Sequence, residues 1–203
     1  MLEQSLPEYN FKIINNQDLY SEDIIHSFQP DIILWYGWSW IIPPNIIEQY
    51  ECLCLHPSAL PKYRGGSPIQ NQIINNEQLS AVTIFKMNDG IDTGDIIKQV
   101  PMLLKGNIQE IFNRMSEIGF IATYDLLTNG YSLQKQNNNQ STYFSRRKPS
   151  DSEITVNEIL SQSADYLYNK IRMLTDPYPN AYIKDKNGNK VYITNAYIKK
   201  ETI

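Results

Sequence analysis

The sequence contains little cysteine, little histidine and no long apolar segment. No run reaches the roughly 18 apolar residues of a membrane-spanning helix, so we expect no segment to cross a bilayer. The first 15 residues lack the charged and then apolar layout of a secretory signal peptide. The only two cysteines, Cys52 and Cys54, stand two apart on a predicted strand, where a mutual disulfide would be strained. We therefore predict reduced cysteines and a cytoplasmic protein.

An excess of positive charge is also missing. The 203 residues carry a formal net charge of -4, with a pI near 5.2, which gives no general attraction to nucleic acids or membrane surfaces. The one local exception is the basic run YFSRRKP at 143–149. A zinc site would need four ligands, and no second cluster completes a set begun by Cys52, Cys54 and His56. We predict no metal.

Short apolar runs alternate with helical patterns over the first third of the chain. DIILWYG (31–37) is a continuous apolar run, typical of a strand buried on both faces. Residues 19–28 and 43–50 have helical patterns, and 51–55 is the next strand. The order strand, helix, strand, helix, strand predicts an α/β fold with a Rossmann-like, mostly parallel sheet.

The rest of the chain changes character near residue 130. We predict helices at 68–77 and 107–130, strands at 80–87 and 94–102, a polar loop in the Asn/Gln-rich run 134–140, a single helix at 154–174, and a β-hairpin around Asn187-Gly188. This pattern divides the chain into a core of residues 1–135 and a small helix-plus-hairpin extension of residues 136–203.

The stretch CLCLHPSALPKYRGGSPIQ (52–70) places one of the two histidines at the end of a predicted strand. Loops at the carboxyl ends of parallel strands often carry function, so His56 is a candidate catalytic residue; its alternative role is a cap that hydrogen-bonds the loop backbone. The loop MNDGIDTGD (87–95) holds Asp89, Asp92 and Asp95, which could equally be ordinary turn residues. A carboxylate beside the imidazole would make a proton-transfer pair.

These two segments resemble the folate-dependent formyltransferase family, which includes methionyl-tRNA formyltransferases and sugar-nucleotide N-formyltransferases. The resemblance lies in HPSALPKYRGGSPIQ, followed about two dozen residues later by VTIFKMNDGIDTGDII. It extends over most of residues 30–183, through WYGWSWIIPPNII, RRKPSDSEI and IRMLTDPYPNAYI. It implies an enzyme that transfers a formyl group from the co-substrate 10-formyltetrahydrofolate to a primary amine, without a metal.

The resemblance also implies roles for individual residues. His56 would accept the proton of the attacking amine, and Asp92 would hold the imidazole and stabilise its charged form. Cys54 stands where the family has an asparagine, and a thiol is a weaker donor to an oxyanion than an amide. The residues implied to line the folate pocket are Trp38, Ser39, Trp40, Ile42, Met87, Asn88, Asp89 and Gly90; those implied to contact the substrate are Arg64, Gly65 and Gly66. Arg64 is equally well interpreted as a clamp on backbone carbonyls.

Two further expectations follow from the resemblance. Family members usually have a strand, a glycine-containing turn and a helix before the segment similar to FKIINNQDLY (11–20), and here that unit is missing. We therefore expect an exposed sheet edge, which a homodimer would cover. Because the chain is acidic and its extension is short, we favour a nucleotide-linked amino sugar as substrate over nucleic acid. The alternatives are methionyl-tRNA, water in a formyltetrahydrofolate hydrolase, and a degenerate relative that binds without catalysis.

Overall fold

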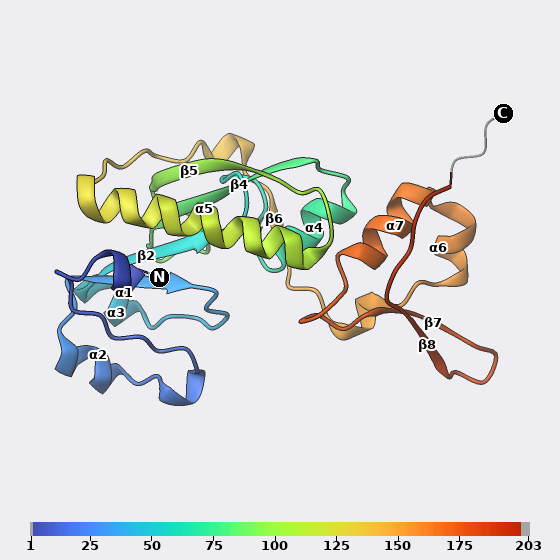
Figure 1. Ribbon diagram of the computed structural model, residues 1–203, viewed down its shortest axis with the longest axis horizontal. Coiled ribbons are helices and arrows are strands. Elements are labelled where there is room, and N and C mark those ends of the chain that lie inside the picture. The colour runs from blue at the N-terminus through green and yellow to red at the C-terminus, as the bar shows by residue number, and fades with distance from the viewer. Residues whose placement is uncertain (1, 200–203) are drawn as a thin grey trace.

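The computed structural model describes residues 2–199 as helices packed around a four-stranded sheet, with a smaller extension at one end (Figure 1). The helices are α1 (Leu2–Ser5), α2 (Glu22–Phe28), α3 (Pro44–Gln49), α4 (Pro68–Ile74), α5 (Ile108–Asn129), α6 (Val156–Ser161) and α7 (Ala164–Arg172). The strands are β1 (Ile32–Tyr36), β2 (Glu51–His56), β3 (Arg64–Gly65), β4 (Leu79–Lys86), β5 (Ile96–Leu103), β6 (Tyr143–Phe144), β7 (Ala181–Lys184) and β8 (Lys190–Ile193). In this part of the chain no helix is long and apolar enough to cross a membrane.

The central sheet has the strand order β1-β2-β4-β5. β1 and β2 run parallel, as predicted, whereas β4 joins β2 antiparallel and β5 joins β4 antiparallel. The α/β class and the C-terminal hairpin are confirmed, but the described sheet is mixed where we expected mostly parallel pairing. The short loop at 87–95 explains why β5 runs antiparallel to β4, because a parallel connection needs a crossover of a dozen or more residues.

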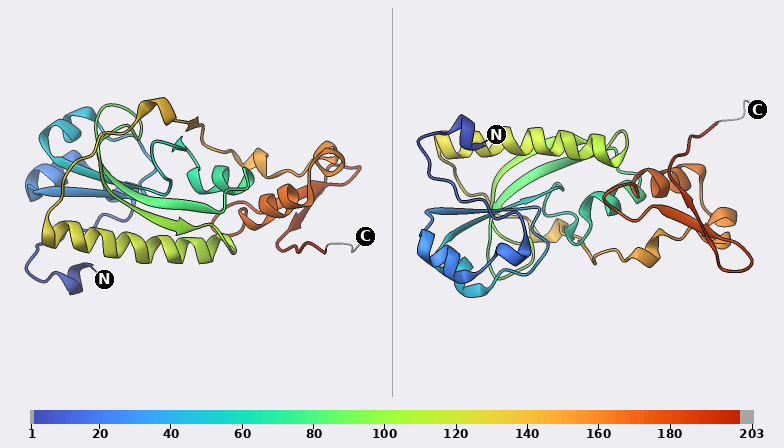
Figure 2. Two further views of the ribbon diagram at one scale, coloured as in Figure 1. Left: turned by 90° about the horizontal axis from the view of Figure 1, so that it is seen from above. Right: turned by 60° about the horizontal axis from the view of Figure 1, so that its bottom comes forward.

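Both faces of β1 and β2 are covered, as the continuous apolar run 31–37 predicts for β1. On one face, Leu34 and Leu53 pack in a cluster with Ala122 and Leu126 of α5. On the other face, a second cluster surrounds Trp35 and includes residues of α2 and α3. Figure 2 shows α5 on one side of these strands and α2 and α3 on the opposite side. The alternation of side chains along each strand therefore separates two differently lined faces.

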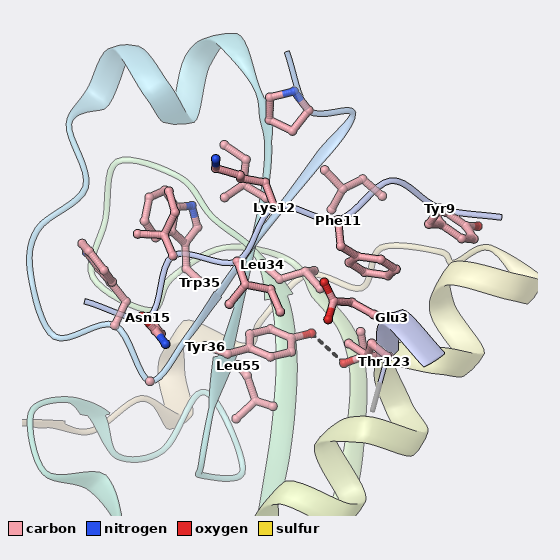
Figure 3. Close-up of a pocket in the computed structure, with 18 of the residues that line it drawn as sticks. Glu3, Tyr9, Phe11, Lys12, Asn15, Leu34, Trp35, Tyr36, Leu55 and Thr123 are labelled. Carbon is pink, nitrogen blue, oxygen red and sulfur yellow. Dashed lines mark hydrogen bonds between the residues drawn. The ribbon is translucent and has the colours of Figure 1, made fainter. Parts of the chain in front are cut away.

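β1 forms one end of the sheet, and its outer edge borders a cavity of about 850 Å³ (Figure 3). The segment 9–15 lines the far side of this cavity, and Met115, Phe120 and Thr123 of α5 line another wall. Residues 10–15 belong to no helix or strand, so the first strand of the predicted alternation does not form. The sheet edge that we expected from the sequence lies here.

The predicted helix at 154–174 is two helices, α6 and α7, and this prediction was wrong. The chain breaks at Gln162 and Ser163, where the Ser163 hydroxyl accepts a hydrogen bond from the backbone N–H of Tyr166 and caps α7. Thr155 begins α6 with a capping box completed by Glu158. Serine and threonine satisfy free N–H groups at helix starts, so each cap begins a new helix inside one apolar pattern.

The extension is joined to the core by shared apolar packing and by one buried cation, Arg172. Ile171 and Met173 lie in the same hydrophobic cluster as Met102 of β5. Arg172 donates hydrogen bonds of 2.7 Å to the carbonyl oxygens of Leu104 and Gly106, beyond the end of β5. The division of the chain near residue 135 stays a prediction, and side chains from both sides of it share this cluster.

Candidate active site

His56 is the last residue of β2 and is only 5% exposed. Its Nε2 lies 2.8 Å from the carbonyl oxygen of Tyr63. Because a carbonyl can only accept, Nε2 carries a hydrogen and donates it there. Nδ1 faces the carboxylate of Asp92 at 3.4 Å. The loop carbonyl therefore sets the tautomer of the ring and leaves Nδ1 as the nitrogen that can take up a proton beside a negative charge.

Asp92 is held in place by the loop that follows His56. Its Oδ2, the oxygen that faces His56, also accepts a hydrogen bond of 2.7 Å from the backbone N–H of Gly65. The residue has a φ of 53°, in the left-handed region that aspartate tolerates better than most residues. The loop at 87–95 thus reaches the end of β2, as predicted, and presents a fixed carboxylate to the imidazole.

Cys54 lies on the same face of β2 as His56, because it stands two residues earlier on the strand. Burial, and then the negative charge of Asp92, raise the pKa of the Cys54 thiol well above its ordinary value. The raised pKa favours the neutral thiol, which is a weak hydrogen-bond donor and a poor nucleophile. Cys52 and Cys54 are both free.

Arg64 is only 7% exposed as a residue, and its guanidinium is held by neighbouring side chains. It donates hydrogen bonds to the side-chain oxygen of Gln136 and, at 2.8 Å, to that of Asn138. No carboxylate within residues 2–199 forms an ion pair with it, and burial lowers the pKa of Arg64. This arrangement favours the structural interpretation of Arg64 over substrate contact.

Gly65 and Gly66 permit the close approach of the segment that contains β6. A Cβ on Gly65 would lie 2.4 Å from the carbonyl oxygen of Phe144, and Gly65 has a φ of 90°. A Cβ on Gly66 would lie 2.4 Å from the Cα of Arg146. The glycines therefore let β3 pair with β6, which brings the basic run 146–148 beside the candidate site.

The predicted folate segment is an aromatic cluster on the same side of the sheet as Cys54. The rings of Trp38 and Trp40 lie 4.9 Å apart, edge to face, and Trp40 is 49% exposed. Trp38, Ile42 and Met87 pack in the cluster that also includes Cys54, while the Ser39 carbonyl accepts a hydrogen bond from Arg146. A half-exposed indole beside apolar side chains suits a flat aromatic ligand.

The turn at 88–90 is closed by its own side chains. The Asn88 oxygen accepts hydrogen bonds from the Gly90 backbone at 3.1 Å and from the Thr93 hydroxyl at 2.7 Å. Asp89 and Gly90 are exposed. The structure thus gives Asn88 a local structural role, and a ligand contact at Asp89 or Gly90 stays a prediction.

The cavity beside β1 shares Trp35 and Trp38 with the aromatic cluster but does not reach the candidate catalytic residues. Trp35 and Leu55 line it (Figure 3). His56, Asp92 and Cys54 are not among its lining residues. Its walls include the hydrogen-bonded pair of Tyr36 and Thr123, whose hydroxyls lie 2.8 Å apart. The candidate catalytic pair, His56 and Asp92, therefore lies where two loops meet and outside the lining of this cavity.

Sequence reasoning missed the contribution of residues 136–147 to the site. Gln136 belongs to a run that we interpreted as a polar surface loop, yet its amide bonds both Arg64 and the Asp92 loop. The Thr142 hydroxyl accepts a hydrogen bond from the backbone N–H of Tyr63, and the backbone N–H of Arg147 donates one to the Ser67 hydroxyl. These contacts join residues about 80 positions apart, and no local pattern predicts them.

Comparisons with known proteins show the family of the chain. Residues 4–123 match the formyl transferase family. A methionyl-tRNA formyltransferase of Orientia tsutsugamushi is 32% identical over 191 residues, which is 91% of this chain and 60% of that protein. A solved methionyl-tRNA formyltransferase from Clostridium thermocellum is 36% identical with a TM-score of 0.83, covering 95% of this chain and 88% of the other. A 4-N formyltransferase from Francisella tularensis is 24% identical, covers 98% and 83% of the two chains, and shares the fold with a TM-score of 0.70.

The curated relatives are longer than this chain. This chain spans about 60% of the Orientia protein that it matches. What those proteins bind and act on as whole molecules is therefore a hypothesis for this chain.

Proposed function

The chain belongs to the formyl transferase family, and we propose that it transfers a formyl group from 10-formyltetrahydrofolate to a primary amine. One observation carries the proposal: His56 is buried, its Nε2 is tied to a loop carbonyl, and its Nδ1 faces the Asp92 carboxylate at 3.4 Å. A base with a fixed tautomer and an adjacent negative charge is what an amine nucleophile requires.

The reaction joins the amine nitrogen to the formyl carbon and breaks the bond between that carbon and N10 of the folate. The attacking nitrogen loses one proton, and N10 gains one. We assign the first transfer to Nδ1 of His56, because Nε2 is already protonated towards Tyr63. Asp92 stabilises the imidazolium that forms, and the ring then returns the proton to the leaving nitrogen.

Cys54 bears on how the oxyanion of the tetrahedral intermediate is stabilised. Its protonated thiol is a weak donor, as the raised pKa of Cys54 and the burial of its sulfur imply. Removing one oxyanion donor lowers rates by roughly 10²- to 10³-fold in well-studied enzymes. We therefore propose slow turnover unless a bound substrate brings a further donor.

The co-substrate supplies the formyl carbon. We propose that its flat ring system lies against Trp38 and Trp40, with Ile42 and Met87 as apolar contacts. The half-exposed face of Trp40 supports this placement, because base-like rings stack on accessible aromatic side chains. Ser39 lies between Trp38 and Trp40 in the sequence, with its carbonyl oxygen bonded to Arg146.

For the acceptor, we propose the amino group of methionyl-tRNA. The two relatives described above with more than 30% identity are methionyl-tRNA formyltransferases, which supports this alternative better than the amino sugar that composition favoured. The basic run also supports it. Arg146 and Arg147 contact Gly66 and Ser67, directly after β3. Within residues 2–199 neither these two residues nor Lys148 forms an ion pair. Unpaired cations near a site attract phosphates.

A nucleotide-linked amino sugar is the second candidate. The observation that favours it is the net charge of -4, since affinity for nucleic acids comes largely from phosphate contacts with basic surfaces. A nucleotide sugar needs only one or two such contacts, which the basic run could supply. Both candidates share a phosphate-bearing amine.

The test is a transfer assay with 10-formyltetrahydrofolate and three acceptors. One reaction contains methionyl-tRNA, one contains a nucleotide-linked 4-amino sugar, and one contains water alone with formate measured. We expect a formylated product, detected by mass spectrometry, with methionyl-tRNA. A product with the sugar alone would select the second candidate, and formate alone would indicate a hydrolase.

The chain offers a matched control, because it has two histidines. We expect His56→Ala to lower the rate by at least about 100-fold, the scale of general base catalysis. His26→Ala should leave it unchanged, because His26 is exposed and bonds only the Tyr50 hydroxyl in the described structure. Absence of product in all three reactions, together with no folate binding by calorimetry, would refute the proposed function.

A further inference from the structure

The side-chain amide of Gln136 makes four hydrogen bonds with two loops of the candidate site. Nε2 donates to the carbonyl oxygens of Asp92 at 2.9 Å and of Gly94 at 2.7 Å. Oε1 accepts from Nε and Nη2 of Arg64 at 3.2 and 2.7 Å. An amide has two N–H donors and an oxygen with two lone pairs, so all of its capacity is used between these loops.

Arg64 depends on this amide because it is a buried cation without a carboxylate partner in the described structure. The side-chain oxygens of Gln136 and Asn138 take the place of a counterion. Leaving a buried charge without hydrogen bonds is costly. Arg64 therefore fixes Gln136, and Gln136 in turn fixes the loop that contains Asp92.

Asp92 needs such support because its backbone has an uncommon conformation. A non-glycine residue with a φ of 53° persists when its surroundings hold it. The carboxylate is held by the Gly65 N–H at 2.7 Å, and the carbonyl by Gln136 at 2.9 Å. These two bonds fix both ends of the residue, and the 3.4 Å contact with His56 depends on both.

We propose that Gln136, coupled to Arg64, positions Asp92 against His56 and is required for the rate of formyl transfer. This inference rests on the proposed function and adds a residue from the polar run 134–140 to it. Gln136 acts through Asp92 and touches neither His56 nor, in this proposal, the substrate. Arg64 then belongs to the positioning network and not to the substrate contacts.

The first test compares Gln136→Ala and Gln136→Glu with the control Gln134→Ala. Gln134 is exposed, and only its backbone is bonded, to Ile96. A displacement of about 1 Å in a catalytic group can cost about 100-fold in rate. We expect kcat to fall by about 10- to 100-fold for both Gln136 variants, with KM for each substrate within about twofold of the wild type, and no change for Gln134→Ala.

Gln136→Glu separates two ways in which Gln136 could act. A glutamate would still accept from Arg64, now with a full charge, but its second oxygen would face the carbonyls of Asp92 and Gly94 with no hydrogen to donate. If only neutralisation of Arg64 mattered, this variant would keep wild-type kcat. That result, or an unchanged kcat for Gln136→Ala, would overturn the proposal.

A double-mutant cycle with Arg64→Ala tests the coupling. Because the two residues act as one unit, we expect the double variant to lose about as much kcat as the more damaged single variant. If Arg64 instead contacts the substrate, Arg64→Ala would raise KM for the acceptor, and the two losses would multiply. That pattern would refute the shared role.

A second measurement does not depend on activity. The chain has two histidines, so the ring nitrogens of His56 can be followed by NMR, with His26 as the internal reference. We expect the His56 signals to shift in both Gln136 variants and the His26 signals to stay unchanged. Circular dichroism checks that both variants are folded. Unchanged His56 signals in the Gln136 variants would overturn the positioning role. If the signals shift in the variants but the wild type transfers no formyl group, only the proposed function is refuted.

Discussion

Replacing Glu158 with glutamine should destabilise the protein by about 3 kcal/mol at pH 7. The Glu158 carboxylate accepts hydrogen bonds from Lys170 Nζ at 2.6 Å, from the Tyr166 hydroxyl at 3.0 Å and from the Thr155 backbone at 2.8 Å. Burial alone would raise the pKa of Glu158, but the contacts with Lys170, Thr155 and Tyr166 outweigh it and lower the pKa from 4.5 to about 2.

Two routes lead to this magnitude. The difference between 4.5 and about 2, at 1.36 kcal/mol per pKa unit, gives about 3 kcal/mol. Independently, the Lys170 side chain is only 5% exposed, and removing one partner of a buried pair typically costs about 3–5 kcal/mol. The routes agree because a glutamine in place of Glu158 would leave Lys170 charged and buried without a counterion.

The dependence on pH has a definite sign. The pKa of Glu158 is lower in the folded than in the unfolded protein, so its contribution is complete above about pH 4.5 and is lost as the pH falls towards 2. At pH 3 about 2 of the 3 kcal/mol should be gone. Urea unfolding of wild type and Glu158→Gln at pH 7 and pH 3 measures the difference between their unfolding free energies.

A matched control uses an acidic residue without such contacts. Glu117 on α5 is exposed and forms no ion pair within the described residues, so Glu117→Gln should change stability by less than about 0.5 kcal/mol. An equally small loss of unfolding free energy for Glu158→Gln at pH 7 would contradict the stabilising role of its contacts. So would a difference from the wild type that is the same at pH 7 and pH 3.

Three further results are expected. Cys54→Asn should raise kcat by about 10- to 100-fold, since an amide replaces a weak donor; an unchanged rate in the transfer assay would mean that another group fills this role. Gly65→Ala should lower the melting temperature by several degrees, because its Cβ would lie 2.4 Å from the Phe144 carbonyl at a φ of 90°; calorimetry measures this, and a wild-type melting temperature would contradict it. With methionyl-tRNA as acceptor, Arg146→Gln and Lys148→Gln should each raise KM and reduce its dependence on salt; equal salt slopes for variants and wild type would exclude phosphate contacts.

Much of the core could be predicted from the sequence because its signals are local. The apolar run 31–37 and the helix at 107–130 have clear periods and ends, and β1 and α5 lie within two residues of them. The direction of β4 was harder, because pairing depends on how a connection turns in space. The break between α6 and α7 was missed because Ser163 reads as an ordinary polar residue inside an apolar pattern.

The candidate site divides in the same way. His56 ends a strand directly before a glycine- and proline-rich loop, and Asp92 stands in a glycine-containing loop, so their proximity was expected. Arg64 and its partner Gln136 are 72 positions apart. The run that contains Gln136 is recognisable in the sequence only as a polar segment. Long-range partners of polar side chains leave no period in the sequence, and the fold itself is needed to find them.

The buried cations of the extension differ in what neutralises them, and this sets the order in which its parts come away from the core. Both cations lie on α7. Lys170 bonds the charged Glu158 of α6 as well as the Glu153 carbonyl, whereas Arg172 relies on the uncharged carbonyls of Leu104 and Gly106. Protons can remove a carboxylate charge but leave a carbonyl dipole intact. Acid should therefore release α6 first as a local opening, while α7 stays docked and the core remains closed.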